Sequence, residues 1–337
     1  MKKSMKRILS LSLVLVFVVA LSGISYADVS KEYHWTAAMT VSETTINYMI
    51  VDKFAELLNE RSGGKVTVDL YPGGQLGNDN EMFQAVRDGS IDILTSMSSG
   101  MVDFVPEAGV FDLPNLFPSV EIMRKALSGE FMEAFNNYCN NGGYELLGFS
   151  DAGFRQLTSN KEVRSVADFA GLKLRTMNNK YHLAYWQALG ANPLPMDFTE
   201  VYMGLQQHTI DGQENPYMNI VGNSFQEVQK YIVETNHLGH IIIVLMNNNL
   251  YQSLPEDVKA LVDECAAEAI AYGNSKADES IAGYKQTCED AGCEIITLST
   301  EDLATMQESA ATVYDMVRAD LGDQLVDQLL DAVKAAS

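Results

Sequence analysis

Strand-like and helix-like segments alternate along the first hundred residues, and this alternation limits the fold more than any other feature of the chain. Residues 33–39, 66–70 and 91–94 have the apolar pattern of short strands. Residues 44–61 and 78–87 carry apolar side chains at helical spacing, and each segment is followed by glycine, which commonly ends a helix. Strands that alternate with helices form a mainly parallel sheet with helices on its faces. The sequence therefore predicts an α/β fold.

A second α/β unit is predicted over roughly the middle third of the chain. This unit is expected to extend over residues 153–240. Its helices are predicted at 180–189 and 198–206, and its strands near 155–157, 173–175 and 212–214. Two such units fit the length of 337 residues, since about 100–200 residues usually make one domain. No internal repeat appears, which argues against a solenoid.

The longest helical pattern follows this unit. Residues 253–256 read as a capping box with Pro255 at the first helical position, and helix-compatible residues continue to about 290, where Gly292 can end the helix. At 1.5 Å per residue such a helix is about 50 Å long, which exceeds the diameter of one small domain. It must either kink near Gly273 or run across two lobes, and we expect the second arrangement.

The N-terminus has the pattern of an export signal. Four basic residues lie within positions 2–7, an apolar run covers 8–21, and the small-x-small triplet 25–27 resembles a cleavage site. A membrane anchor is the alternative, but the apolar run is shorter than the ~20 residues that a membrane-spanning helix needs. We therefore predict a signal peptide over residues 1–27, cleavage after Ala27 and a periplasmic product.

The charge balance excludes some partners. The chain has 23 basic and 45 acidic residues, a formal net charge of −22. Nucleic-acid binding needs a basic surface, and anionic lipid also attracts basic segments, so neither partner is expected. A small anion in a cleft remains possible, because exposed charges more than about 8 Å away are screened whereas charges within a cleft are not.

Cysteine and histidine give no metal-site pattern. The four cysteines are Cys139, Cys265, Cys288 and Cys293. The CxxC spacing of zinc sites is absent, and a Cys288 disulfide with Cys293 or Cys139 stays as open as buried free thiols. His237 and His240 have no third ligand in a recognisable pattern, and His182 and His208 read as ordinary helix residues. We expect neither a metal nor a cofactor.

The segment from 153 to 216 collects polar side chains suited to an organic anion. Arg175 follows alternating apolar residues at a strand end, where α/β folds place ligand contacts. A guanidinium group matches a carboxylate with two parallel charge-assisted hydrogen bonds. Arg155 supplies a second cation, and Asn215 precedes a proline that favours an extended backbone. The alternatives are a surface ion pair for Arg175 and a salt bridge between domains for Arg155.

Several motifs occur in an order that resembles one transport family. They are 71–77 (YPGGQLG), 110–114 (VFDLP), 190–193 (GANP), 200–202 (EVY), 211–216 (DGQENP), 225–231 (FQEVQKY) and 235–237 (TNH). Together they resemble the substrate-binding subunits of tripartite ATP-independent periplasmic (TRAP) transporters of the DctP type. The resemblance covers nearly all of the chain beyond the predicted signal peptide.

This resemblance implies a two-lobed periplasmic binding protein, type II-like, with a long helix spanning both lobes. Lobe I would comprise residues 28–152 and 241–280, and lobe II residues 153–240 and 281–337. Such proteins are not enzymes. They close over a small organic acid between the lobes and deliver it to a TRAP permease, which uses an ion gradient without ATP.

The resemblance also implies roles for individual residues. Arg175 would be the carboxylate clamp, with Arg155 as a second cation. Asn215 and Asn178 would be amide contacts, and Phe198 an apolar wall. Lobe I would discriminate among ligands through Thr40, Met97 and Ser98. Relatives that bind sialic acid carry asparagine and glutamate in place of Thr40 and Met97, so that sugar is not expected.

Two other functions remain open at this point. A sensory protein would present its ligand to a membrane receptor, and the sequence scarcely separates that role from transport. A secreted hydrolase with paired carboxylates is the other alternative, but the motifs GxSxG and HExxH are absent. The ligand itself stays open among C4-dicarboxylates, sugar acids and aromatic or branched monocarboxylates. A monomer is the expected state.

Overall fold

The computed structural model describes residues 29–337 of the protein. The predicted signal peptide, residues 1–27 with its cleavage site after Ala27, lies outside the described residues. Among those residues, no helix is both long enough and apolar enough to cross a membrane.

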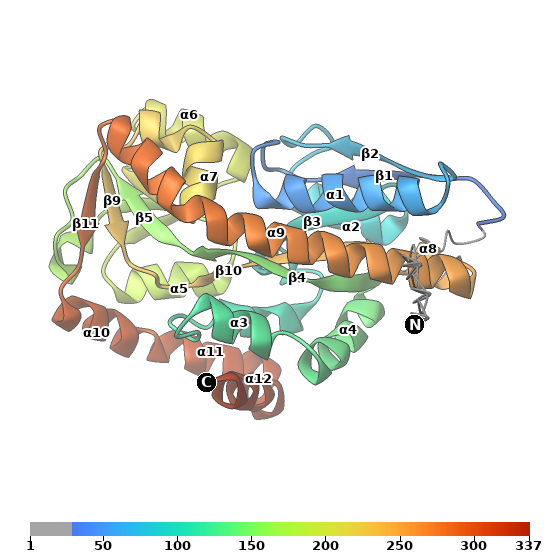
Figure 1. The fold of residues 1–337 in the computed structure, drawn as a ribbon. Helices are drawn as coiled ribbons and strands as arrows, with labels where there is room; N and C mark the ends of the chain where they lie inside the picture. The colour runs from blue at the N-terminus through green and yellow to red at the C-terminus, as the bar shows by residue number, and fades with distance from the viewer. Residues whose placement is uncertain (1–28) are drawn as a thin grey trace, which may run out of the picture.

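The first of two sheets has five strands in the order β2-β1-β3-β10-β4 (Figure 1). Its strands are β1 (Tyr33–Ala38), β2 (Val66–Tyr71), β3 (Ile93–Met97), β4 (Tyr144–Phe154) and β10 (Gly239–Asn247). Strand β1 is parallel to both β2 and β3, because the helices α1 (Ile46–Arg61) and α2 (Asp79–Asp88) make the crossover connections. Strand β10 is antiparallel to both of its neighbours.

The second sheet has six strands in the order β11-β9-β5-β8-β6-β7. They are β5 (Gln156–Ser159), β6 (Lys173–Thr176), β7 (Asn192–Pro195), β8 (Gly212–Asn215), β9 (Tyr231–Glu234) and β11 (Glu294–Thr297). The helices between its strands are α5 (Lys180–Ala188), α6 (Val201–Gln206) and α7 (Tyr217–Gly222). The α/β prediction is confirmed, but both sheets are mixed, since β5 and β10 are antiparallel to both of their neighbours.

The chain crosses between the two sheets at neighbouring points. Strand β4 of the first sheet leads directly into β5 of the second, and β9 of the second leads into β10 of the first. The two crossings are adjacent because Gly239 of β10 pairs with Phe154 of β4. Arg155, expected within a strand, is the single residue between β4 and β5. We call the part of the molecule around each sheet a lobe.

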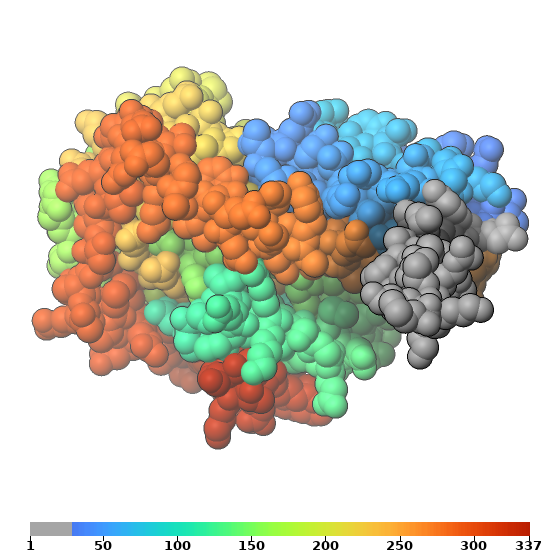
Figure 2. Space-filling view, viewed as in Figure 1, coloured from blue at the N-terminus to red at the C-terminus, as the bar shows by residue number. Residues whose placement is uncertain are grey.

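Helix α9 (Glu256–Asp290) is one uninterrupted helix of 35 residues, about 52 Å long at 1.5 Å per residue. It packs on α1 and β4 of the first lobe and on α7 of the second, so the expected span across both lobes is confirmed (Figure 1). Its outer side forms much of the surface in Figure 2. At Gly273, a Cβ atom would lie 2.3 Å from Ile50 Cγ1, so the glycine permits close packing on α1 and causes no kink.

The start of α9 differs from the prediction. Pro255 occupies the N-cap position, and no side chain caps the helix. The Ser253 hydroxyl donates instead to the carbonyl of Leu250, at the end of the short helix α8 (Asn248–Ser253). The capping box predicted over residues 253–256 is therefore wrong. By contrast, the predicted glycine end of α2 is present, since Gly89 ends the helix with φ 80°. Asn78 and Glu81 form a reciprocal capping box at its start.

The remaining helices cover the face of the sheets opposite α9 (Figure 1). They are α3 (Val120–Ala126), α4 (Glu130–Gly142), α10 (Thr300–Ser309), α11 (Ala311–Leu321) and α12 (Asp323–Ala336). Helix α12 packs against α3 and α4, whereas α11 packs against α5. One apolar core runs from Leu146 of the first sheet to Leu174 of the second. The C-terminal helices thus contact both predicted lobes, and the predicted lobe boundaries stay a prediction.

All four cysteines are buried free thiols in this structure. Cys288 and Cys293 belong to the same small apolar cluster beneath α6 and α7. Burial raises the pKa of the Cys288 thiol to about 12, which keeps it protonated and unreactive at neutral pH.

Candidate ligand-binding site

A small cavity of about 30 Å³ lies between the two lobes. Its lining combines residues of both lobes: Thr40, Val41, Asn47, Asp79, Thr95, Ser96, Met97, Arg155, Arg175, Met177, Phe198, Asn215, Asn219 and His240. The lobes contact each other beside it. Ser42 Oγ donates to the Gly222 carbonyl at 2.7 Å, and Asn78 Nδ2 donates to Asp197 Oδ2 at 3.0 Å. A ligand in this cavity would be enclosed from both sides.

Arg175 is buried in this cavity and has an unused donor. It lies near the end of β6, where Nε and Nη2 both donate to the Met196 carbonyl, at 2.9 and 2.7 Å. Its Nη1 is buried and has no hydrogen-bond partner among residues 29–337, and the guanidinium lies 5.7 Å from the centre of the Phe198 ring. Burial lowers the pKa of Arg175 to about 10, while the charge of Glu214 raises it. A positive charge is thus held in place without a contacting counter-ion in the described chain.

Arg155 has no donor to spare. Nε and Nη2 form an ion pair with the Glu214 carboxylate, and Nη2 also donates to the Glu214 carbonyl. Nη1 donates to Met97 Sδ at 3.0 Å and to His240 Nδ1 at 2.8 Å. Arg155 lines the cavity, but its ion-pair partner Glu214 belongs to the same predicted lobe, residues 153–240, so the pair is not the alternative salt bridge between domains. Its expected role as a second cation for the ligand is not supported by this geometry.

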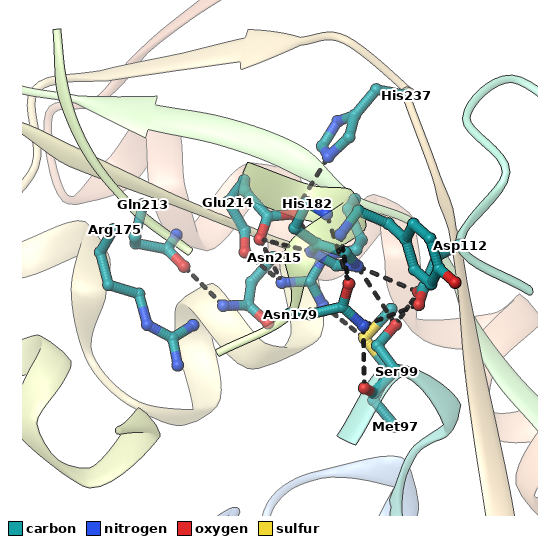
Figure 3. Close-up of polar contacts among 12 residues, drawn as sticks. Met97, Ser99, Asp112, Arg175, Asn179, His182, Gln213, Glu214, Asn215 and His237 are labelled. Carbon is teal, nitrogen blue, oxygen red and sulfur yellow. Dashed lines mark hydrogen bonds and ion pairs between the residues drawn. The ribbon is translucent and has the colours of Figure 1, made fainter. Parts of the chain in front are cut away.

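Glu214 is the centre of a buried network at the lobe crossing (Figure 3). His237 Nε2 donates to Glu214 Oε2 at 3.0 Å, and His182 Nδ1 lies 3.8 Å from Oε1. On its other side, His182 Nε2 lies 3.1 Å from Asp112 Oδ1 in the first lobe. Burial alone would raise the pKa of Glu214, but Arg155 and the two histidines hold it well below its usual range. Figure 3 shows Arg175 apart from this network, with no dashed line to the residues drawn.

The three histidines of the network differ in charge: the pKa of His182 is raised, whereas those of His237 and His240 are lowered. Burial would lower the pKa of His182, but its hydrogen bonds to Asp112 and Glu214 raise it to about 9. Burial lowers the pKa of both His237 and His240, and His240 can accept from Arg155 only when it is neutral. His182 was predicted to be an ordinary helix residue, but in the structure it lies between the carboxylates of Asp112 and Glu214. The sequence did not indicate this position, because neither of these acidic partners lies near His182 along the chain.

Asn215 lies in the cavity at the end of β8, as expected. Its Nδ2 donates to Gln213 Oε1 at 2.5 Å, and its Oδ1 accepts from Asn219 Nδ2 at 3.2 Å (Figure 3 shows the first of these bonds). An amide nitrogen has two hydrogens, so one remains for a ligand. Asn219 is the third residue of the helix α7 that follows, and sequence reasoning missed it.

The first lobe contributes Thr40 and Met97 to the cavity, as predicted, but not Ser98. Ser98 is buried outside the lining, and Ser96 lines the cavity instead. The strand runs to Met97, three residues beyond its predicted end, and Ser98 begins a short 3-10 helix that turns away from the strand direction. Thr40 and Ser96 both donate to Asp79 Oδ1, at 3.1 and 2.9 Å.

Phe198 lines the cavity beside Arg175, as predicted, whereas Asn178 does not. Asn178 is exposed and lines an adjoining opening that it shares with Arg175 and Phe198. Its neighbour Asn179 is the buried amide: it caps α5 and donates from Nδ2 to Asp112 Oδ2 at 2.7 Å. The expected ligand contact of Asn178 is therefore not supported.

Two further cavity residues were absent from the sequence prediction. Asp79, in the first turn of α2, is one of them, and it lines the cavity. Asn47 of α1 donates to Thr95 Oγ1 at 3.1 Å, while its own Oδ1 is buried without a partner in the described chain. A buried polar residue on the apolar face of α1 was the available signal for Asn47.

Comparison with known proteins places this geometry in a family. Residues 37–320 match the model of the bacterial extracellular solute-binding proteins, family 7, named DctP. The C4-dicarboxylate-binding periplasmic protein DctP of Rhodobacter capsulatus is 34% identical over 293 residues, which covers 85% of each chain.

Solved structures agree with the same assignment. The sugar acid binding protein DctPAm of Advenella mimigardefordensis, in complex with galactonate, has a TM-score of 0.88 at 28% identity and covers 91% of this chain and 99% of its own. A TRAP periplasmic solute-binding protein of Shewanella oneidensis, with bound succinate, has a TM-score of 0.85 at 29% identity and covers 90% and 99%. The resemblance seen in the sequence is confirmed: the chain belongs to the DctP family, family 7 of the bacterial extracellular solute-binding proteins.

Proposed function

We propose that this protein captures a small organic acid in the cavity between its lobes and delivers it to the membrane subunits of a TRAP permease. One observation carries the proposal: Arg175 presents a buried Nη1 donor without a partner in the described chain, inside a cavity closed by both lobes. The bound carboxylate would supply both the missing acceptor and the missing negative charge.

The physical argument depends on the cost of an unpaired group. A buried donor without an acceptor is unfavourable by about 1–3 kcal/mol, and more when the group is charged. The Met196 carbonyl holds two guanidinium nitrogens of Arg175 and fixes the direction of the third. A carboxylate at Nη1, joined by the free hydrogen of Asn215 Nδ2, would satisfy both groups. Such preorganised donors favour binding because little freedom is lost when the ligand arrives.

The relatives support the class of ligand and the location. The similar proteins named above are a C4-dicarboxylate-binding periplasmic protein and two binding proteins with bound galactonate or succinate. Each of these ligands carries a carboxylate. We infer a periplasmic location, with the signal peptide removed after Ala27, and a monomer that meets its permease as a single chain. These proteins bind and release their ligands, and no chemical step is assigned to this chain.

Substitution of Arg175 by lysine tests the proposal. Lysine keeps the charge but cannot bond the Met196 carbonyl twice and a carboxylate at the same time. Truncating one partner of a buried charge pair costs about 2–5 kcal/mol, so affinity for the bound acid should fall roughly 30- to several-thousand-fold. Arg164→Lys is the matched control, because Arg164 is exposed and forms ion pairs with Glu162 and Glu294 at the surface.

Affinities are measured by calorimetry against organic acids that first raise the melting temperature of the native protein. Arg164→Lys should bind as the native protein does. Equal affinity of Arg175→Lys and the native protein would remove Arg175 from the site and overturn the proposal. Loss of uptake of the same acid after deletion of the gene distinguishes transport from presentation to a sensory receptor.

A further inference from the structure

The cavity around Arg175 contains buried acceptors as well as its unused donor. Asn219 Oδ1 and Asn47 Oδ1 are buried without a hydrogen-bond partner among residues 29–337, and both residues line the cavity. Such acceptors are unfavourable unless a donor arrives. A carboxylate supplies only acceptors. The ligand must therefore bring hydrogen-bond donors as well as its acid group to satisfy these two oxygens.

A line of hydrogen bonds fixes which atom of Asn219 faces the cavity. Gln229 Nε2 donates to two backbone carbonyl groups, which can only accept, so Gln229 Oε1 must accept from the Thr158 hydroxyl at 2.7 Å. Thr158 Oγ1 then accepts from Gln213 Nε2 at 3.0 Å, and Gln213 Oε1 accepts from Asn215. Asn215 Oδ1 consequently accepts from Asn219 Nδ2. The oxygen of Asn219, and not its nitrogen, is left for the ligand.

Asp79 adds a carboxyl group to the same cavity. Burial raises the pKa of this carboxyl group, while Thr40 and Ser96, which both donate to its Oδ1, oppose that shift. Asp79 and Arg175 form no ion pair within 4 Å in the described residues, although both line the cavity. A guanidinium and a carboxyl group are therefore available to different parts of one ligand.

We propose that the ligand is a small carboxylate that also carries hydrogen-bond donors, either hydroxyl or ammonium groups, on carbons away from its acid group. The inference rests on the proposed function, since it assumes that Arg175 holds the carboxylate. The donors of the ligand then bond to Asn219 Oδ1, Asn47 Oδ1 and the Asp79 carboxyl group. A plain dicarboxylate fits this arrangement poorly, because its second carboxylate brings no donor to the buried oxygens of Asn219 and Asn47.

Two matched series of acids test this inference by calorimetry at pH 7.5. The four-carbon series is butanoate, succinate, 4-aminobutanoate and 2,3,4-trihydroxybutanoate, and the six-carbon series is hexanoate, adipate, 6-aminohexanoate and gluconate. We expect a donor-bearing acid to bind at least tenfold more tightly than the plain acid and the diacid of equal length, which corresponds to about 1.4 kcal/mol. The hydroxyl and ammonium members then identify the source of the donors.

Two variants locate the effect in the cavity. Asp79→Asn replaces one carboxyl oxygen by an amide nitrogen that donates and cannot accept, so the preference for the donor-bearing acid over the diacid should fall at least tenfold. Asp69→Asn is the matched control, because Asp69 is exposed on β2, and it should leave the preference unchanged. Asn219→Leu should weaken only the donor-bearing acids. Because it also removes the donor to Asn215, its melting temperature is measured alongside.

The outcomes separate this inference from the proposed function. Equal or tighter binding of the diacid or the plain acid in both series would overturn the inference and leave the proposed function intact. An unchanged preference in Asp79→Asn would also overturn it. Failure of all eight acids to bind would contradict the carboxylate site itself, and with it both proposals.

Discussion

The charge of His182 should make the stability of the protein fall between neutral and alkaline pH. His182 is buried between Asp112 of the first lobe and Glu214 of the second, with Nε2 at 3.1 Å from Asp112 Oδ1. These carboxylates overcome the effect of burial and raise the pKa of His182 to about 9. In the unfolded chain the pKa is about 6.5. The folded state therefore holds a proton that the unfolded state has lost between these values.

The sign and the size follow from that difference. A pKa raised on folding contributes stability that is fully present below pH 6.5 and is lost as the pH rises through about 9. Each pKa unit corresponds to 1.36 kcal/mol, so about 2.5 units give a contribution of about 3 kcal/mol. The lowered pKa values of His237 and His240 act on the acidic side of pH 6.5, outside this window.

The assay is urea unfolding at pH 6, 7, 8, 9 and 9.5 of the native protein and of His182→Gln. The free-energy difference between the two proteins should shrink by about 3 kcal/mol from the lowest to the highest pH, since glutamine keeps the polarity without titrating. His34→Gln, at an exposed position on β1, is the matched control and should show no such trend. A difference that stays constant from pH 6 to 9.5 would refute a charged His182.

Two further predictions concern stability. Glu214→Gln leaves Arg155 buried without its counter-ion and should lower the free energy of unfolding in urea by about 3–5 kcal/mol. The double variant Arg155→Met with Glu214→Leu should recover much of that loss. A double variant less stable than the single variant would contradict this reasoning. At Gly212 a Cβ atom would lie 2.1 Å from the backbone oxygen of Thr158 on the paired strand, so Gly212→Ala should cost about 1–3 kcal/mol. Gly283→Ala has open space on the exposed face of α9 and should instead stabilise by up to about 1 kcal/mol, and equal effects of the two alanines in thermal unfolding would argue against the close contact.

Local patterns predicted most elements of the fold. The helices at α1, α2 and α5 and the strands at β1, β2, β6 and β8 lie within two residues of their expected positions. Periodicity and helix-ending glycines act over a few residues, so the sequence contains them directly. The packing of α12 on α3 and α4 was not predicted. An amphipathic pattern indicates that a helix packs against a partner, but it does not identify the partner.

The candidate site divides in the same way. Arg175, Asn215 and Phe198 were predicted and lie together in the cavity, because one continuous stretch of chain supplies them to one lobe. Ser98 and Asn178 were also predicted but do not line this cavity, since Ser98 begins the 3-10 helix after β3 and Asn178 lies at the adjoining opening. Asn47 and Asn219 reach the cavity from α1 and α7, which adjoin it only in the folded molecule.

The amino-acid sequence by itself determined the alternation of strands and helices, the long helix and the presence of a guanidinium at a strand end, because each is a property of neighbouring residues. Only the tertiary structure decided which charges are available. It paired Arg155 with Glu214 across 59 positions of the chain and left Arg175 Nη1 without a partner in the described residues. Both are arginines near strand ends, and what separates them is the buried carboxylate that folding brings to one of them and not to the other.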